Sequence, residues 1–162
     1  MTPEPAAGPA ARGAARLVLR LPAETGYLAV IRELVAAAAR EYHFSAAELT
    51  KVVMAVDEAC VNVVQHAYGG APPQRRPPLE VRVQVDPSRL VVIISDRSPV
   101  AFSPLDHPTP DLKAYWESAG PKGLGILILR QFMDQVSHSY LPGRGNRLRL
   151  VKYTSSPPPP SC

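Results

Sequence analysis

The chain has 162 residues, of which 46% are hydrophobic and 20% charged, a composition typical of one globular domain with a sizeable core. The net charge of +4 comes without a run of Lys and Arg, which argues against nucleic-acid binding. The chain has only two cysteines and no apolar segment of roughly 18 residues, so we expect a cytoplasmic protein without disulfides or membrane spans.

Both ends of the chain are rich in proline and poor in large apolar residues. We expect a disordered leader over residues 1–15, one folded domain over residues 16–153 and a disordered tail over residues 154–162. Hydrophobic periodicity predicts, in chain order, a strand at 16–21, a helix from 28 to 42, a second helix from the capping box Ser45–Glu48 to Gly69-Gly70, strands at 79–85 and 90–94, a third helix from 124 to 135, and strands at 136–141 and 147–153. This order predicts an α+β fold, a two-layer sandwich with helices on one face of a mixed, mainly antiparallel sheet.

A long connection separates the fifth predicted element from the third helix. Residues 97–122 contain several prolines, and one short helix is expected near residues 111–118. Connections of this length in a compact domain are usually functional lids or mobile segments.

Three polar residues of the second predicted helix follow one another at four-residue spacing. Glu58, Asn62 and His66 therefore fall on one face, which carries a carboxylate, a carboxamide and an imidazole. Such a face can hold a metal ion or move a proton. A solvated polar face of an amphipathic helix has the same spacing, so the spacing alone leaves both interpretations open.

Two further signals lie later in the chain. Lys122 and the run Gly123-Leu124-Gly125 open the third helix, where glycines allow close approach of a ligand and free N–H groups can bind phosphate. Asp96 directly follows the apolar strand at 90–94 and could accept a hydrogen bond from a base amino group. Taken singly, each signal is at least as typical of a hinge or a turn. Their order along the chain favours one nucleotide site.

These residues resemble the Bergerat-fold, or histidine-kinase-like, ATPases, and among them the anti-sigma-factor serine-protein kinases of bacterial partner switching. The resemblance covers residues 16–153. Its motifs are Glu58-Ala-Cys-Val-Asn62 with His66-Ala-Tyr68 for the N-box, Asp96 for the adenine-binding aspartate, Gly123-Leu-Gly-Ile126 with Met133-Asp134 for the glycine box, and Asn146-Arg-Leu-Arg-Leu-Val-Lys152 for the closing strand.

The resemblance implies an ATP- and Mg²⁺-dependent protein-serine kinase. It implies that Asn62 binds Mg²⁺, that Glu58 acts as general base toward a serine hydroxyl, and that His66 supports its neighbours. Nucleotide contacts are expected from Asn62, Asp96, Lys122, Gly123, Leu124 and Gly125. The implied partners are a sigma factor, an anti-sigma-factor antagonist that carries the acceptor serine, and a second copy of the chain in a homodimer.

Three positions depart from the family pattern. The family usually has glycine where this chain has Ser98, often has another glycine or a small polar residue where it has Pro99, and commonly has threonine where it has Gly145. These departures keep open a second interpretation, a non-catalytic regulator of the same fold that binds a partner and little or no nucleotide. A third interpretation, a switch protein that activates a phosphatase instead of inhibiting a sigma factor, is also compatible with the domain sequence.

Overall fold

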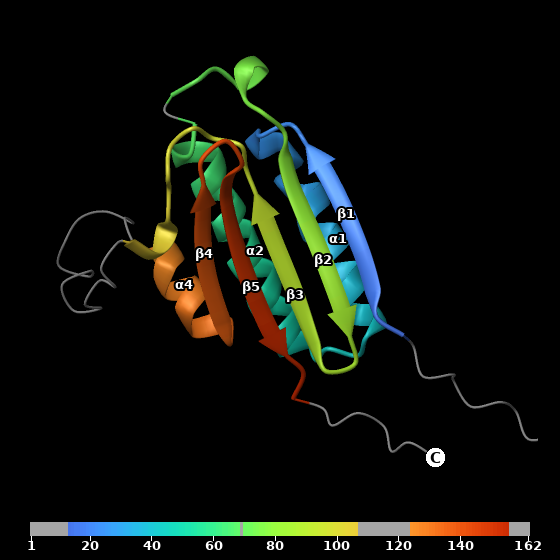
Figure 1. The fold of residues 1–162 in the computed structure, drawn as a ribbon. Coiled ribbons are helices and arrows are strands. Elements are labelled where there is room, and N and C mark those ends of the chain that lie inside the picture. The colour runs from blue at the N-terminus through green and yellow to red at the C-terminus, as the bar shows by residue number, and fades with distance from the viewer. Residues whose placement is uncertain (1–12, 69, 107–123, 156–162) are drawn as a thin grey trace, which may run out of the picture.

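The computed structural model describes residues 13–68, 70–106 and 124–155. Its strands form one five-stranded sheet in the order β1-β2-β3-β5-β4 (Figure 1). The strands are β1 Ala15–Leu21, β2 Leu79–Asp86, β3 Arg89–Ser95, β4 Gln135–Leu141 and β5 Gly145–Tyr153. Each neighbouring pair of these strands is antiparallel. The sequence therefore predicted the strands correctly. The sheet was expected to be mixed and mainly antiparallel, and the described strands form antiparallel pairs alone.

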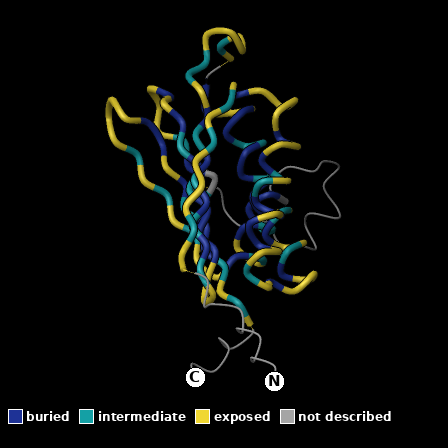
Figure 2. Tube along the Cα trace, turned by 90° about the vertical axis from the view of Figure 1, so that its right-hand side faces the viewer, coloured by how far each residue is buried: buried dark blue, intermediate teal, exposed yellow. Residues whose placement is uncertain are grey.

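The helices lie together on one face of the sheet, as Figure 2 shows from the side. They are α1 Leu28–Glu41, α2 Ala46–His66 and α4 Leu124–Phe132. The predicted capping box opens α2, because the Ser45 hydroxyl accepts from the Glu48 N–H and the Glu48 carboxylate accepts from the Ser45 N–H. The predicted two-layer α+β sandwich is confirmed.

All three described helices end earlier than the sequence predicts, α1 by a single residue. The structure ends α2 at His66, before the glycine pair that was expected to stop it. It ends α4 at Phe132 instead of Gln135. The cause at α4 is tertiary, since the Asp134 N–H donates to the Val151 carbonyl at 2.9 Å and so brings the chain into β4. The helical periodicity of the sequence carries no signal of that contact.

The core lies between the sheet and the helical layer. Alternate residues of β2 are buried, and the register places Val81 opposite Ile94 and Val83 opposite Val92 on the same face. The apolar sides of α1 and α2 cover this face, with Val35 and Val56 fully buried. This packing holds α2 against the sheet and leaves its polar face for other contacts.

Several predictions lie outside the described residues. They include the short helix near 111–118, Lys122, Gly123 and most of the leader and the tail. The first residues of the expected tail do make contacts, since the Thr154 N–H donates to the Ser88 carbonyl at 3.0 Å. Over the ranges that are described, no helix is long and apolar enough to cross a membrane.

Candidate functional site

The polar face of α2 is only partly covered by the rest of the domain. Glu58 and Asn62 are half-buried, and His66 is exposed in the last turn, whereas Val56 and Cys60 are fully buried. Neither Glu58 nor Asn62 forms a side-chain hydrogen bond or ion pair with another described residue. Both side chains are therefore available to a ligand.

The start of α4 packs directly on Glu58. A methyl group added to Gly125 would lie 2.5 Å from Glu58 Oε1 and 2.7 Å from Glu58 Cγ, closer than nonbonded atoms approach. With the Glu58 side chain in its observed position, only glycine leaves room here. The structure thus brings the polar stripe of α2 against the glycine-rich start of α4, whose first N–H groups have no partner within the helix.

The surroundings of Glu58 disfavour its charged form. Partial burial, followed by the negative charge of neighbouring Asp57, raises the pKa of the Glu58 carboxyl above its ordinary value. Asp57 in turn accepts a hydrogen bond from Arg32 of α1, with 2.6 Å between Arg32 Nη1 and Asp57 Oδ1. A carboxylate with a raised pKa is a better proton acceptor, which suits a general base.

Asp96 lies just beyond the end of β3 and is almost completely buried, at 2% exposure. Its Oδ1 accepts from the Ser98 N–H at 2.9 Å and from Asn146 Nδ2 at 3.1 Å. Its own N–H donates to the Asn146 carbonyl at 3.1 Å. Its second oxygen, Oδ2, has no hydrogen-bond partner among the described residues. Oδ1 thus accepts hydrogen bonds from within the protein, while Oδ2 can accept one from a ligand.

Asn146, at the start of β5, is the residue whose importance the sequence did not reveal. It is 4% exposed, and besides Asp96 its Nδ2 donates to Ser98 Oγ at 2.8 Å and the Val100 carbonyl at 3.0 Å. Its Oδ1 accepts from the Phe102 N–H at 2.8 Å and lies 3.0 Å from Nε2 of His138 on β4. The motif that resembled the family's closing strand begins with Asn146. Nothing in the sequence pattern indicates that this side chain connects β5 to the segment after β3.

The residues that replace family glycines fit the segment after Asp96. The left-handed backbone conformation occurs, apart from glycine, only at His43 within the described ranges, so the backbone at Ser98 has a conformation open to any residue. The Ser98 hydroxyl donates to the Val100 carbonyl at 2.9 Å, and the Pro99 carbonyl accepts from the Tyr140 hydroxyl at 2.6 Å. These bonds tie the segment to its own backbone and to β4.

Gly145 is required by a close approach of two backbone segments. Its φ of +84° is unfavourable for other residues, and a Cβ there would overlap the Asp96 carbonyl oxygen and lie 2.6 Å from Arg97 Cα. Where this chain departs from the family's threonine, the two backbone segments therefore leave no space for a side chain.

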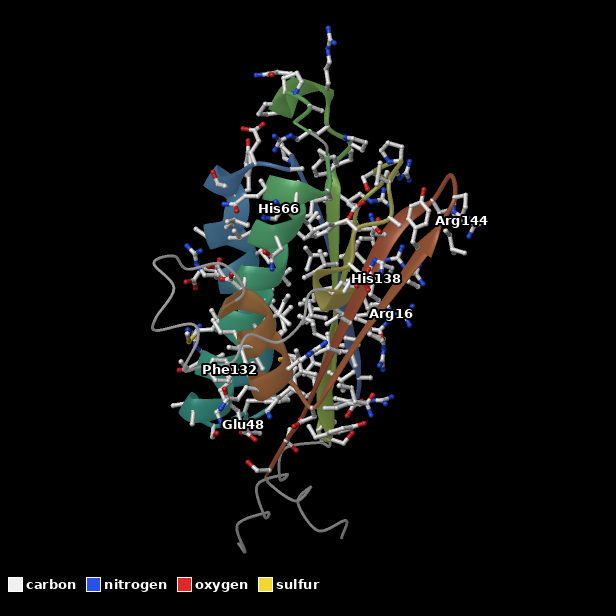
Figure 3. All side chains as sticks on the ribbon, turned by 90° about the vertical axis from the view of Figure 1, so that its left-hand side faces the viewer. Arg16, Glu48, His66, Phe132, His138 and Arg144 are labelled. Atoms are coloured by element: carbon white, nitrogen blue, oxygen red, sulfur yellow. The ribbon has the colours of Figure 1, made fainter. Side chains whose placement is uncertain are left out.

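His66 contacts the same segment from the other layer. Its ring lies 5.8 Å from the Phe102 ring, centroid to centroid, at an interplanar angle of 34°. Figure 3 shows His66 in the helical layer and His138 on the side of the sheet. Phe102 therefore connects the last turn of α2 with the Asn146 network, a contact for which the sequence carries no signal.

The donor set suits a magnesium ion that arrives with a nucleotide. The described residues contain no group of three or more His, Cys, Asp or Glu that could hold a metal by themselves. Mg²⁺ bound to a nucleotide takes only one or two protein oxygens and completes its shell with phosphates and water. The free carboxamide of Asn62, one turn from Glu58, fits this requirement. Lys122, Gly123 and the side chain of Leu124 lie outside the described part of the site.

Comparisons with known proteins identify the family of the domain. The family model of the histidine kinase-like ATPase domain matches residues 21–152. The serine-protein kinase RsbW of Bacillus velezensis is 30% identical over 73% of this chain and 74% of its own length. The anti-sigma F factor of Pasteuria penetrans is 31% identical over 65% of this chain and 68% of its own. The serine-protein kinase RsbW of Bacillus subtilis is 30% identical, with 83% of each chain covered.

Two solved structures share the fold. The SiaB–SiaC complex from Pseudomonas aeruginosa contains a chain that superposes with a TM-score of 0.63 and 15% identity, covering 84% of this chain and 88% of that one. The histidine kinase domain of the Erythrobacter litoralis blue-light activated kinase EL346 gives a TM-score of 0.50 at 18% identity, covering 83% and 62%. The resemblance found in the sequence is confirmed, and the chain belongs to the family of histidine kinase-like ATPase domains.

Proposed function

We propose that this protein is an ATP- and Mg²⁺-dependent protein-serine kinase that phosphorylates an anti-sigma-factor antagonist and sequesters a sigma factor. The observation that carries the proposal is the packing of Gly125 against Glu58, with Asn62 one helical turn away. The names of the curated relatives, serine-protein kinase RsbW and anti-sigma F factor, support both the activity and the partners.

Each residue of the site has a role in this proposal. Asn62 holds Mg²⁺ through its carboxamide oxygen, and the ion supplies neutralisation of the phosphate charge that phosphoryl transfer requires. Glu58 accepts the proton of the acceptor serine hydroxyl. Asp96 accepts a hydrogen bond from the adenine amino group through its free Oδ2. The backbone N–H groups at the start of α4, together with Lys122 and Gly123, contact the phosphates.

Phosphorylation of the antagonist tests the proposal directly. The purified protein is mixed with Mg²⁺-ATP and its cognate antagonist, and the antagonist is analysed by mass spectrometry for phosphate on serine. The control variant Glu58→Ala is expected to bind ATP and to transfer no phosphate, while Asn62→Ala is expected to lose the Mg²⁺ dependence of ATP binding. A wild-type protein that binds ATP but leaves the antagonist unmodified would reject the kinase activity.

A non-catalytic regulator remains the second candidate. Ser98 and Pro99, which replace small residues of the family beside Asp96, favour it. Calorimetric titration separates the candidates, since a regulator of this kind binds a sigma factor or antagonist without binding ATP. The family resemblance further implies a homodimer, which sedimentation of the purified protein would test.

A further inference from the structure

The carboxamide of Asn146 has its orientation set by its neighbours. The Phe102 N–H is an obligatory donor and lies 2.8 Å from Asn146 Oδ1, so this end of the carboxamide must be the oxygen. The opposite end is then Nδ2, which lies within 3.1 Å of Asp96 Oδ1. Asn146 therefore presents a hydrogen-bond donor to Asp96, and at 4% exposure no bulk water competes for it.

This donor determines which oxygen of Asp96 is free. Oδ1 already accepts from the Ser98 N–H at 2.9 Å and from Asn146, and these two bonds fix the plane of the carboxylate. Oδ2 is left as an acceptor that can pair only with a donor. A ligand with an amino group there gains a hydrogen bond, whereas a ligand with a carbonyl oxygen would place two acceptors against each other.

We propose that Asn146 is a positioning residue that sets the base preference of the site by holding the Asp96 carboxylate with Oδ2 toward the ligand. The proposal rests on the nucleotide site proposed above. It goes beyond that site because it assigns selectivity to a residue that need not touch the nucleotide. The same carboxamide also bonds to the Val100 carbonyl and the Phe102 N–H. It therefore fixes the position of the loop after Asp96 relative to the Asp96 carboxylate.

The variant Asn146→Asp isolates this role because it has nearly the same shape. It keeps the oxygen that accepts from the Phe102 N–H but replaces the donor that faces Asp96 with an acceptor. Binding of Mg²⁺-ATP and Mg²⁺-ITP is measured by calorimetry, since inosine has a carbonyl where adenine has its amino group. We expect the wild-type protein to prefer ATP by about tenfold or more, and N146D to lose most of that preference.

The control is Val83→Ala, a fully buried residue of β2 that lies opposite Val92, four residues before Asp96 in the chain. This variant should lower the thermal midpoint and leave the ratio of ATP to ITP affinity unchanged. If N146D fails to fold by circular dichroism, Asn146→Ser replaces it, because serine removes the long donor without adding charge. A variant of Asn146 that folds and retains the wild-type ratio would overturn the positioning role alone. A wild-type protein that binds neither nucleotide would overturn both this role and the proposed function.

Discussion

Gly125 at the start of α4 and Glu58 on α2 are packed so closely that a single methyl group on the glycine would lie 2.5 Å from the carboxylate oxygen Oε1. The position of α4 and the orientation of Glu58 therefore depend on each other. Any movement of the α4 start must move this carboxylate or open a gap beside it. The proposed base, Glu58, and the proposed phosphate-binding turn at the start of α4 are therefore positioned by the same contact.

Gly125→Ala tests this dependence. The added methyl group must displace the Glu58 side chain or shift α4, at a cost of about 1–3 kcal/mol for overpacking. We expect the rate of phosphate transfer to the antagonist to fall more than tenfold, by about 1.4 kcal/mol of barrier or more. Gly26→Ala is the matched control, because a Cβ at Gly26 meets nothing within 4 Å. Equal transfer rates of the two variants would contradict the dependence.

Asp57→Asn should change the pH dependence of the reaction. Burial and then the charge of Asp57 raise the pKa of Glu58, so the base becomes ionised only at a higher pH than an ordinary glutamate. Removing the charge of Asp57 lowers this pKa, and the acidic limb of the transfer rate against pH should move to lower pH. Burial remains, so the shift is partial. Glu33→Gln, which removes an exposed acid of α1, should leave the limb in place.

Gly145→Ala should destabilise the domain more than the comparable change at Gly143. Both glycines have left-handed backbones, with φ of +84° and +77° respectively. A methyl group at Gly143 meets nothing within 4 Å, so that variant pays only the backbone cost of about 1 kcal/mol. At Gly145 the methyl group also overlaps the Asp96 carbonyl. Urea unfolding of both variants measures the difference, and equal losses would show that β5 and the Asp96 segment can separate freely.

The sequence predicted those parts of the fold that depend on local patterns. Alternation in β2 and the Ser45–Glu48 capping box are local signals, and both appear in the structure as expected. The end of α4 depends instead on the contact between Asp134 and Val151. The close approach at Gly145 is likewise tertiary, because the Asp96 and Arg97 backbone that leaves no space for a side chain there comes from a distant part of the chain.

In the candidate site, too, the residues that follow from local patterns could be predicted, and the one that depends on long-range contacts could not. The polar stripe of α2 follows from helical spacing, and Asp96 from its place after an apolar strand. The central position of Asn146 could not be predicted, because its partners Asp96 and Ser98 are 50 and 48 residues away in the chain. A single asparagine at the start of a strand has no periodicity that indicates burial. Only the antiparallel pairing of β3 with β5 brings these groups together.

Glu48 connects the start of α2 with the end of the domain, at the opposite end of the helix from His66 (Figure 3). Its Oε2 accepts from the Ser45 N–H at 2.7 Å, and its Oε1 accepts from the Ser155 N–H at 2.8 Å and from the Ser155 hydroxyl at 2.5 Å. Burial alone would raise the pKa of this carboxyl, but the hydrogen bonds from Ser155 and Ser45 outweigh it and lower the pKa to about 2.

Glu48→Gln should therefore destabilise the domain in a pH-dependent way. A carboxyl whose pKa is lower in the folded chain stabilises that chain fully above the unfolded value of 4.5, and this stabilisation is lost as the pH falls toward about 2. The free energy of unfolding in urea should be lower for E48Q than for the wild-type protein at neutral pH, and the two should converge below pH 4.5. Ser155→Ala, which keeps the backbone donor, should show a smaller difference with the same pH trend. A difference between E48Q and the wild type that does not change with pH would mean that the charge of Glu48 contributes nothing, and that the glutamate acts through its shape alone.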